Sequence, residues 1–166
     1  MIPTRSTSIS YRDQTMTTLY TGGTFDLFHF GHVHFLSQCR VLSDRVVVSL
    51  NTDAFIQQYK KESPVLSFDE RKRSLLASGL VDEVIVNTGG SDSKPAILEV
   101  NPDIICIGDD WAKKDYYSQM SFTQEWLDEQ EIVLCYVPYL KSISTTEIKK
   151  RVAARCACEP GGYGIE

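Results

Sequence analysis

Three short apolar runs constrain the fold of this chain more than any other feature of the sequence. They are RVVVSL at 45–50, DIICIG at 103–108 and EIVLCYV at 131–137, and none alternates strictly between apolar and polar residues. Strands that are covered on both faces have this pattern, whereas strands exposed on one face alternate. We therefore predict a parallel sheet with helices on both sides, which is a three-layered, doubly wound α/β fold of the Rossmann-like kind.

The segments between these runs have the order that such a sheet requires. Further strands are predicted at 18–22 and 84–86, and helices at 32–42, at 67–78, after Pro95, at 122–130 and from about Ser144. Ligands of these sheets bind beyond the carboxyl ends of the strands, where loops lead into helices. Those loops are where we expect a functional site.

Length and composition fit one domain. The 166 residues, 42% of them hydrophobic, suffice for a single core, which we expect at 16–155 between flexible tails at 1–15 and 156–166. A net charge of -5 disfavours nucleic acid as a partner. We expect no membrane span, because no apolar run approaches the ~20 residues that one needs. Free cysteines in apolar segments suit a reducing compartment, so we expect a cytoplasmic protein.

The loop after the first predicted strand has the residues of a phosphate site. It reads TGGTFDLFHFGH at 21–32. Gly22 and Gly23 lack Cβ atoms where backbone would approach a phosphate. The helix that follows presents free N–H groups and the positive end of its dipole. An anion is the expected occupant.

Two histidines at the start of that helix are the strongest candidates for chemistry. His29 and His32 are three residues apart, so their rings can lie on one side of the helix, with Gly31 leaving room for a ligand. Two simpler interpretations are local hydrogen bonds at the helix start and a zinc site that also uses His34. Three zinc ligands so close in sequence would need unusual backbone geometry, and we predict no metal ligand among the protein side chains.

The stretch GGTFDLFHFGHVHFL at 22–36 resembles the HxGH signature of the nucleotidyltransferase superfamily, in its cytidylyltransferase branch. GDDW at 108–111 resembles a segment of glycerol-3-phosphate cytidylyltransferases, and ISTT at 143–146 resembles the end of the family motif RTxGISTT. ERK at 70–72 and VDEVI at 81–85 match in family order. The likeness covers the chain from the first predicted strand to the last predicted helix.

This resemblance implies an enzyme of the EC 2.7.7 class that transfers CMP from CTP to a small phosphorylated alcohol, glycerol 3-phosphate or another polyol phosphate. The products would be a CDP-alcohol and pyrophosphate. Such a reaction depends above all on positioning and charge stabilisation. The resemblance also implies a homodimer and a Mg²⁺ ion bound through the nucleotide phosphates, which needs little dedicated protein ligation.

The resemblance assigns roles to individual residues. His29 and His32 would donate hydrogen bonds to the triphosphate, with rings kept neutral by the helix dipole. The nucleotide would be bound by Gly22, Gly23, Thr24, Phe25, Gly31, Asp109, Asp110, Trp111, Ser144, Thr145 and Thr146. Weaker candidates for substrate contacts are Asp26, Asp53, Lys60, Lys61 and Arg71.

Simpler interpretations stay open for three of these groups. Ser144 and Glu147 have the spacing of a plain helix capping box. Asp110 and Trp111 suit an ordinary loop, and the basic run that begins at Arg71 suits a solvated helix face. Lys60 and the lysine after it belong to a predicted loop.

Two positions depart from the family pattern. Tyr139 stands where RTxGISTT has arginine, and Gly79 stands where glycerol-3-phosphate enzymes typically carry arginine. Lys141 is our candidate to replace the first, as a catalytic residue, although lysine lacks the bidentate fork of a guanidinium. Arg40, Arg73 or a partner subunit could also supply the charge.

Two other functions keep the fold. An adenylyltransferase that uses ATP, of the kind that forms FAD or NAD, would keep the histidines, but GDDW argues against it. A nucleotide-binding module without turnover is favoured only by the two lost arginines, and the intact histidine pair argues against it.

Overall fold

The computed structural model describes residues 16–109, 116–138, 140 and 142–157. Five parallel strands form one sheet in the order β3-β2-β1-β4-β5. The elements are β1 (Thr18–Gly23), α1 (Phe30–Leu42), β2 (Arg45–Asn51), α2 (Asp53–Lys60), α3 (Phe68–Ala77), β3 (Glu83–Asn87), α4 (Lys94–Val100), β4 (Ile104–Gly108), α5 (Tyr116–Met120), α6 (Gln124–Glu129), β5 (Val133–Val137) and α7 (Thr145–Ala157). The predicted class of fold is confirmed.

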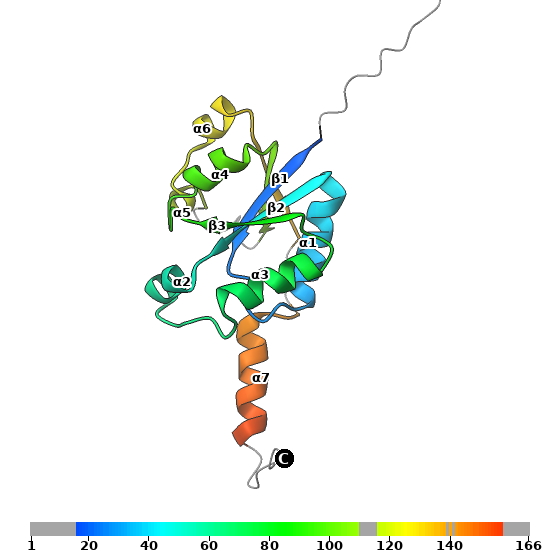
Figure 1. Ribbon diagram of the computed structural model, residues 1–166, viewed down its shortest axis with the longest axis vertical. Helices are drawn as coiled ribbons and strands as arrows, with labels where there is room; N and C mark the ends of the chain where they lie inside the picture. Colours follow the sequence, from blue (N-terminus) through cyan, green and yellow to red (C-terminus); the bar gives the residue numbers. More distant parts are fainter. Residues whose placement is uncertain (1–15, 110–115, 139, 141, 158–166) are drawn as a thin grey trace, which may run out of the picture.

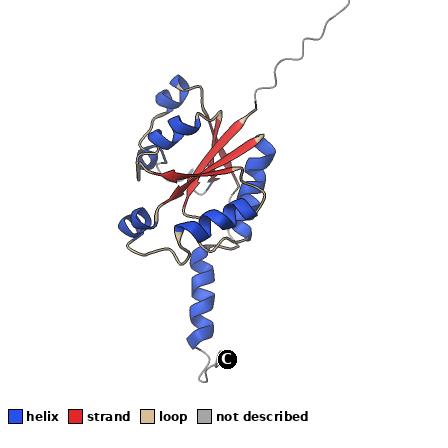
Figure 2. Cartoon of the chain, viewed as in Figure 1, coloured by secondary structure: helices blue, strands red, loops and turns tan. Residues whose placement is uncertain are grey.

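The continuous apolar runs arise because the sheet has a core on each face. In β1, Leu19 packs into the core under α1 and α3, whereas its neighbour Tyr20 packs into the core under α4, α5 and α6. In β4, Cys106 and Ile105 divide between the two cores in the same way. Figure 2 shows the strands between the two sets of helices.

Two helices were not expected. Lys60 and Lys61 were assigned to a loop, which is wrong: Lys60 ends α2, and Lys61 caps it with φ 60°. The N-cap of the helix is Thr52, whose hydroxyl accepts a hydrogen bond from the Phe55 N–H at 3.2 Å. Phe55, Ile56 and Tyr59 form a short apolar stripe on α2, but the helix has only eight residues and only Ile56 is buried. The five residues of α5 are too few to form such a stripe.

The strand order places a crevice at the carboxyl ends of β1 and β4. From β1 the chain builds outward through β2 to β3, and it then returns to the other side of β1 to form β4 and β5. The loops that leave β1 and β4 therefore diverge to opposite faces, which is where open α/β sheets bind ligands.

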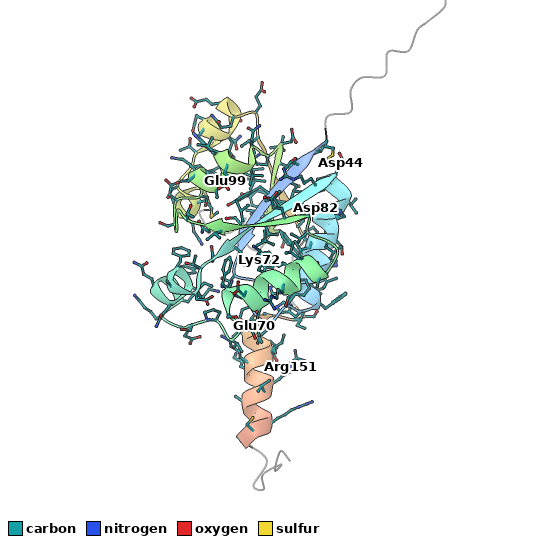
Figure 3. The ribbon with its side chains drawn as sticks, viewed as in Figure 1. Asp44, Glu70, Lys72, Asp82, Glu99 and Arg151 are labelled. Atoms are coloured by element: carbon teal, nitrogen blue, oxygen red, sulfur yellow. The ribbon has the colours of Figure 1, made fainter. Side chains whose placement is uncertain are left out.

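The last helix starts at this crevice and extends away from the body of the protein (Figure 1). It continues to Ala157, past the expected start of the tail at 156. Residues 150–157 are all exposed, and Arg151 lies on this projecting part (Figure 3). Within the residues that the structure describes, no helix has both the length and the apolar character needed to cross a membrane.

Candidate active site

A cavity of about 660 Å³ opens at the carboxyl ends of the strands. Its wall brings together most of the predicted site: Gly22, Gly23, Thr24, Phe25, Asp26, His29, Gly31, His32, Lys60, Ser144, Thr145 and Thr146. Among the other predicted residues, Asp53, Lys61, Arg71 and Asp109 do not line it. Asp110, Trp111 and Lys141 lie outside the described residues, as does Tyr139.

The two histidines are held by the helix start that they form. His29 is the N-cap of α1, and its Nδ1 accepts a hydrogen bond from the Gly31 N–H at 3.1 Å. The Nδ1 of His32 accepts one from the His29 N–H at 3.3 Å. The rings stack, with centroids 3.8 Å apart. The local hydrogen bonds of the simpler interpretation are therefore present. They do not prevent a role in catalysis, because a neutral ring that accepts at Nδ1 carries its proton on Nε2 and can donate from there.

Gly31 makes room for a ring, whereas we expected room for a ligand. A Cβ on Gly31 would lie 2.9 Å from Cε1 of His29 and 3.3 Å from Cγ2 of Ile143. The first distance is shorter than real Cβ contacts allow. Glycine at this position lets the His29 ring fold back onto its own helix start, and it lets the segment before α7 approach the turn.

Both imidazoles are neutral near pH 7. Burial lowers the pKa of His29 below its ordinary value. Burial and the neighbouring His29 lower the pKa of His32 to about 3, although the charge of Asp26 opposes the change. The turn thus presents two Nε2–H donors without carrying a charge of its own.

The lowered pKa of His32 predicts a pH-dependent stability. Its folded pKa of about 3 lies below the ordinary 6.5, so the unfolded chain binds more protons between these values, and stability falls as the pH drops below 6.5. Between pH 7 and pH 5 the loss amounts to about 2 kcal/mol. His32→Asn keeps an acceptor for the His29 N–H but does not titrate. We expect its free energy of unfolding, measured in urea, to fall less than that of the wild type by about this amount. Parallel pH profiles would contradict the assignment.

Asp26 ties three segments to the turn. The residue is 4% exposed, and its side chain accepts hydrogen bonds at 3.0 Å from the N–H groups of Leu27, Val65 and Leu66. Burial favours a raised pKa, but these donors and Lys149 together lower the pKa of Asp26. The Thr145 hydroxyl donates a hydrogen bond to the backbone carbonyl of Asp26 at 2.8 Å. Asp26 therefore joins the start of α7 and the loop before α3 to the histidine turn.

Arg71 is buried, and the interpretation of its helix face as solvated is wrong for this residue. Its side chain is fully enclosed, and the guanidinium donates to the carbonyls of Leu66, Thr24 and Asn51 and to the Asp53 carboxylate. It does not reach the cavity. Arg71 and Asp53 hold the loops behind the cavity wall in place.

The structure adds residues that sequence reasoning missed. Lys149 and Lys150 of α7 line the cavity, and so do Phe55 and Tyr59 of α2. Lys149 follows Thr145 by four residues, so both lie on one helix face, and this spacing could have predicted that Lys149 reaches the site. Burial, and then the charge of Lys149, lower the pKa of Lys60. Three lysines around one opening repel one another, and a bound anion would relieve that repulsion.

Arg40 is committed elsewhere. Its guanidinium binds both carboxylate oxygens of Asp82, at 2.6 and 2.8 Å, and the Asp44 carbonyl. Asp44 and Asp82 precede β2 and β3, at the end of the sheet away from α7 (Figure 3). The cavity lies at the opposite, carboxyl ends of the strands. Arg73 is exposed on α3 and does not line the cavity either.

Neutral donors at a helix start, facing a cavity with lysines at the switch point of a parallel sheet, suit the phosphates of a nucleotide, as the site of a nucleotidyltransferase requires. The chain belongs to the cytidylyltransferase-like family, whose model matches residues 20–151. Glycerol-3-phosphate cytidylyltransferase of Bacillus subtilis (strain 168) is 36% identical over 138 residues, which cover 83% of this chain and 98% of the relative. FAD synthase of Thermococcus onnurineus (strain NA1) is 37% identical over 99 residues, 60% of this chain and 66% of its own.

Solved structures agree on the fold. The lipopolysaccharide core biosynthesis protein from Thermoplasma volcanium GSS1 superposes with a TM-score of 0.61 at 23% identity, over 76% of this chain and 100% of that one. The identity is low, so this likeness speaks for the fold alone.

Proposed function

We propose that the protein transfers CMP from CTP to a small phosphorylated alcohol, with glycerol 3-phosphate or another polyol phosphate as acceptor. The observation that carries this proposal is the histidine turn. Both Nδ1 atoms are occupied by backbone donors, so both Nε2–H groups are available to a phosphate in the cavity. Donors that are fixed before the reaction stabilise developing charge without reorganisation.

In the proposed reaction, an oxygen of the acceptor phosphate attacks the α-phosphorus of CTP. The bond from that phosphorus to the bridging oxygen breaks, and pyrophosphate leaves with the electron pair. His29 and His32 donate to phosphate oxygens as the charge shifts, and neither forms a covalent bond. Ser144 and Thr146, at the start of α7, bind the β and γ phosphates with their hydroxyls and free N–H groups. Thr145 contributes its N–H, because its hydroxyl already donates to the Asp26 carbonyl.

The relatives bear on the choice of nucleotide. The glycerol-3-phosphate cytidylyltransferase matches over 98% of its own length, whereas the FAD synthase matches over 66%. This supports CTP, together with the resemblance of the GDDW segment. Transfer of AMP from ATP is the second candidate, because FAD synthases are also similar to this chain.

The two positions that lack the family arginine differ in what takes its place. We propose that Lys149 and Lys150 supply the positive charge that the family arginine would bring at Tyr139, since both line the cavity. Lys141 stays a prediction. Gly79 follows α3 with φ 70°, a conformation that strains an arginine, so this position ends the helix in the present chain.

Magnesium is proposed to arrive with the nucleotide and to be held by its phosphates. Asp26, the carboxylate next to the turn, is already engaged by three backbone N–H groups and by Lys149. In the described part of the chain, no three or more His, Cys, Asp or Glu side chains form a metal-binding group. The ion would neutralise charge on the phosphates. A homodimer remains part of the proposal.

Pyrophosphate release tests the proposal. We expect release from CTP, with Mg²⁺ and a polyol phosphate, to exceed release from ATP by about tenfold or more, as for a site that hydrogen-bonds one base. The acceptor panel is glycerol 3-phosphate, ribitol 5-phosphate, phosphocholine and FMN. Release only with ATP and FMN would replace the proposal with the second candidate.

A further inference from the structure

One end of the cavity is polar but uncharged. Its residues come from three strands and are Tyr20 of β1, Ser49 and Asn51 near the end of β2, and Asn87 at the end of β3. The last three lie on the far side of β1 from β4, which leads to the GDDW segment. With the nucleotide on the β4 side, the space on the β2 and β3 side is left for the acceptor.

Ser49 is a buried hydroxyl without a hydrogen-bond partner. It is 1% exposed, and its Oγ finds no partner among the described residues. It pairs in register with Gly22, where an added Cβ would lie 3.5 Å from the Tyr20 hydroxyl. Burial raises the pKa of Tyr20 to about 12, and the neighbouring Ser49 hydroxyl partly offsets this rise. Two protonated hydroxyls therefore lie close together in residues that line the cavity.

Asn87 supplies a second unpartnered atom. Its side-chain Nδ2 donates to Oδ1 of Asn51 at 2.8 Å and to the Gly90 carbonyl at 2.9 Å. Both donors are used by oxygen acceptors, so the orientation of the amide is fixed by its surroundings. Its Oδ1 is buried and has no partner among the described residues. Buried polar atoms in native proteins nearly always have a partner, which is a ligand or water when protein supplies none.

The chemistry of this end favours hydroxyl groups over a cationic acceptor. None of its four side chains carries a carboxylate that could pair with an ammonium group. A hydroxyl both donates and accepts, so it can bind the Ser49 Oγ and the Asn87 Oδ1 alike. A phosphorylated acyclic polyol presents hydroxyls on successive carbons.

We propose that the polar end binds the carbon chain of a polyol phosphate, with Ser49 and Asn87 hydrogen-bonded to its hydroxyl groups. This rests on the proposed transfer to an alcohol phosphate and names the part of the acceptor that is recognised. Ser49 and Asn87 then determine specificity, whereas the histidines act on the nucleotide.

The deciding variant is Ser49→Ala, because it removes a hydroxyl that is unpartnered in the free protein and so costs little stability. Asn87→Ala is a less clear test, because it also removes the two hydrogen bonds that Asn87 donates to Asn51 and Gly90. Ser43→Ala is the matched control: its hydroxyl donates to the Cys39 carbonyl at the other end of the sheet, away from the cavity. The full chain is assayed for pyrophosphate release with CTP and Mg²⁺, against glycerol 3-phosphate, ribitol 5-phosphate and n-propyl phosphate.

We expect Ser49→Ala to lower kcat/KM for a polyol phosphate by about five- to tenfold, the worth of one hydrogen bond, and to leave the KM for CTP unchanged. The wild type should disfavour n-propyl phosphate, and the variant should lose much of that discrimination. An unchanged kcat/KM would overturn this inference alone. A raised KM for CTP would place the nucleotide at the polar end and overturn it too. If the wild type released no pyrophosphate from CTP with any acceptor, the proposed function itself would fail.

Discussion

Replacing His32 with alanine is expected to lower kcat by about 10²- to 10³-fold, the usual effect of removing a fixed donor to a transition state. The Nε2–H of His32 is one of two donors that the turn presents to the cavity. His29→Ala should have a comparable effect on kcat and should also cost about 1 kcal/mol of stability, because His29 caps α1.

Two controls separate chemistry from folding. His29→Asn keeps a cap acceptor for the Gly31 N–H but lacks the ring donor, so it should lose turnover while keeping most of the stability. His34→Ala, on the same helix but outside the cavity wall, should keep normal turnover. Near-normal kcat in both His29→Ala and His32→Ala would contradict the proposed role of the turn.

Arg71→Ala is expected to give the largest loss of stability, about 3–5 kcal/mol, because it removes the donors to three backbone carbonyls and leaves a cavity in place of a fully buried side chain. The carbonyls belong to Thr24, Asn51 and Leu66, and the Asp53 carboxylate, whose side chain is 45% exposed, also loses its ion-pair partner. Arg71→Lys should lie between wild type and alanine, since lysine keeps the charge but not the planar fork.

Urea unfolding measures both variants, with Arg73→Ala as the control on the same helix. Arg73 is exposed, so its removal should change the free energy of unfolding by less than about 0.5 kcal/mol. A loss of less than 1 kcal/mol in Arg71→Ala would show that the buried network contributes little, against the expected ~3 kcal/mol or more.

The sequence was most informative where a residue pattern is produced by only one kind of structure. The apolar runs predicted buried parallel strands because a strand with a core on each face needs apolar side chains in both directions. The glycines at the end of β1 and the histidines after it predicted the position of the site, because strand order and helix direction bring those segments to one edge of the sheet.

Other features depend on contacts that a local pattern does not contain. Arg71 looked like part of a solvated basic run, yet it lies four residues before Leu75, and both side chains are fully buried on one helix face. Its partners come from segments that only the folded chain assembles. Gly31 likewise serves a ring of its own turn, and Ser49 looks like a minor interruption of an apolar strand until the cavity is seen.

Following the α-phosphate of CTP tests the proposed transfer of CMP most directly. CTP labelled at that position is incubated with the protein, Mg²⁺ and a polyol phosphate, and the products are separated. We expect label in a CDP-alcohol, unlabelled pyrophosphate, and a corresponding loss of labelled product in His32→Ala. Label found only in CMP, or transfer from labelled ATP with none from CTP, would contradict the proposed transfer.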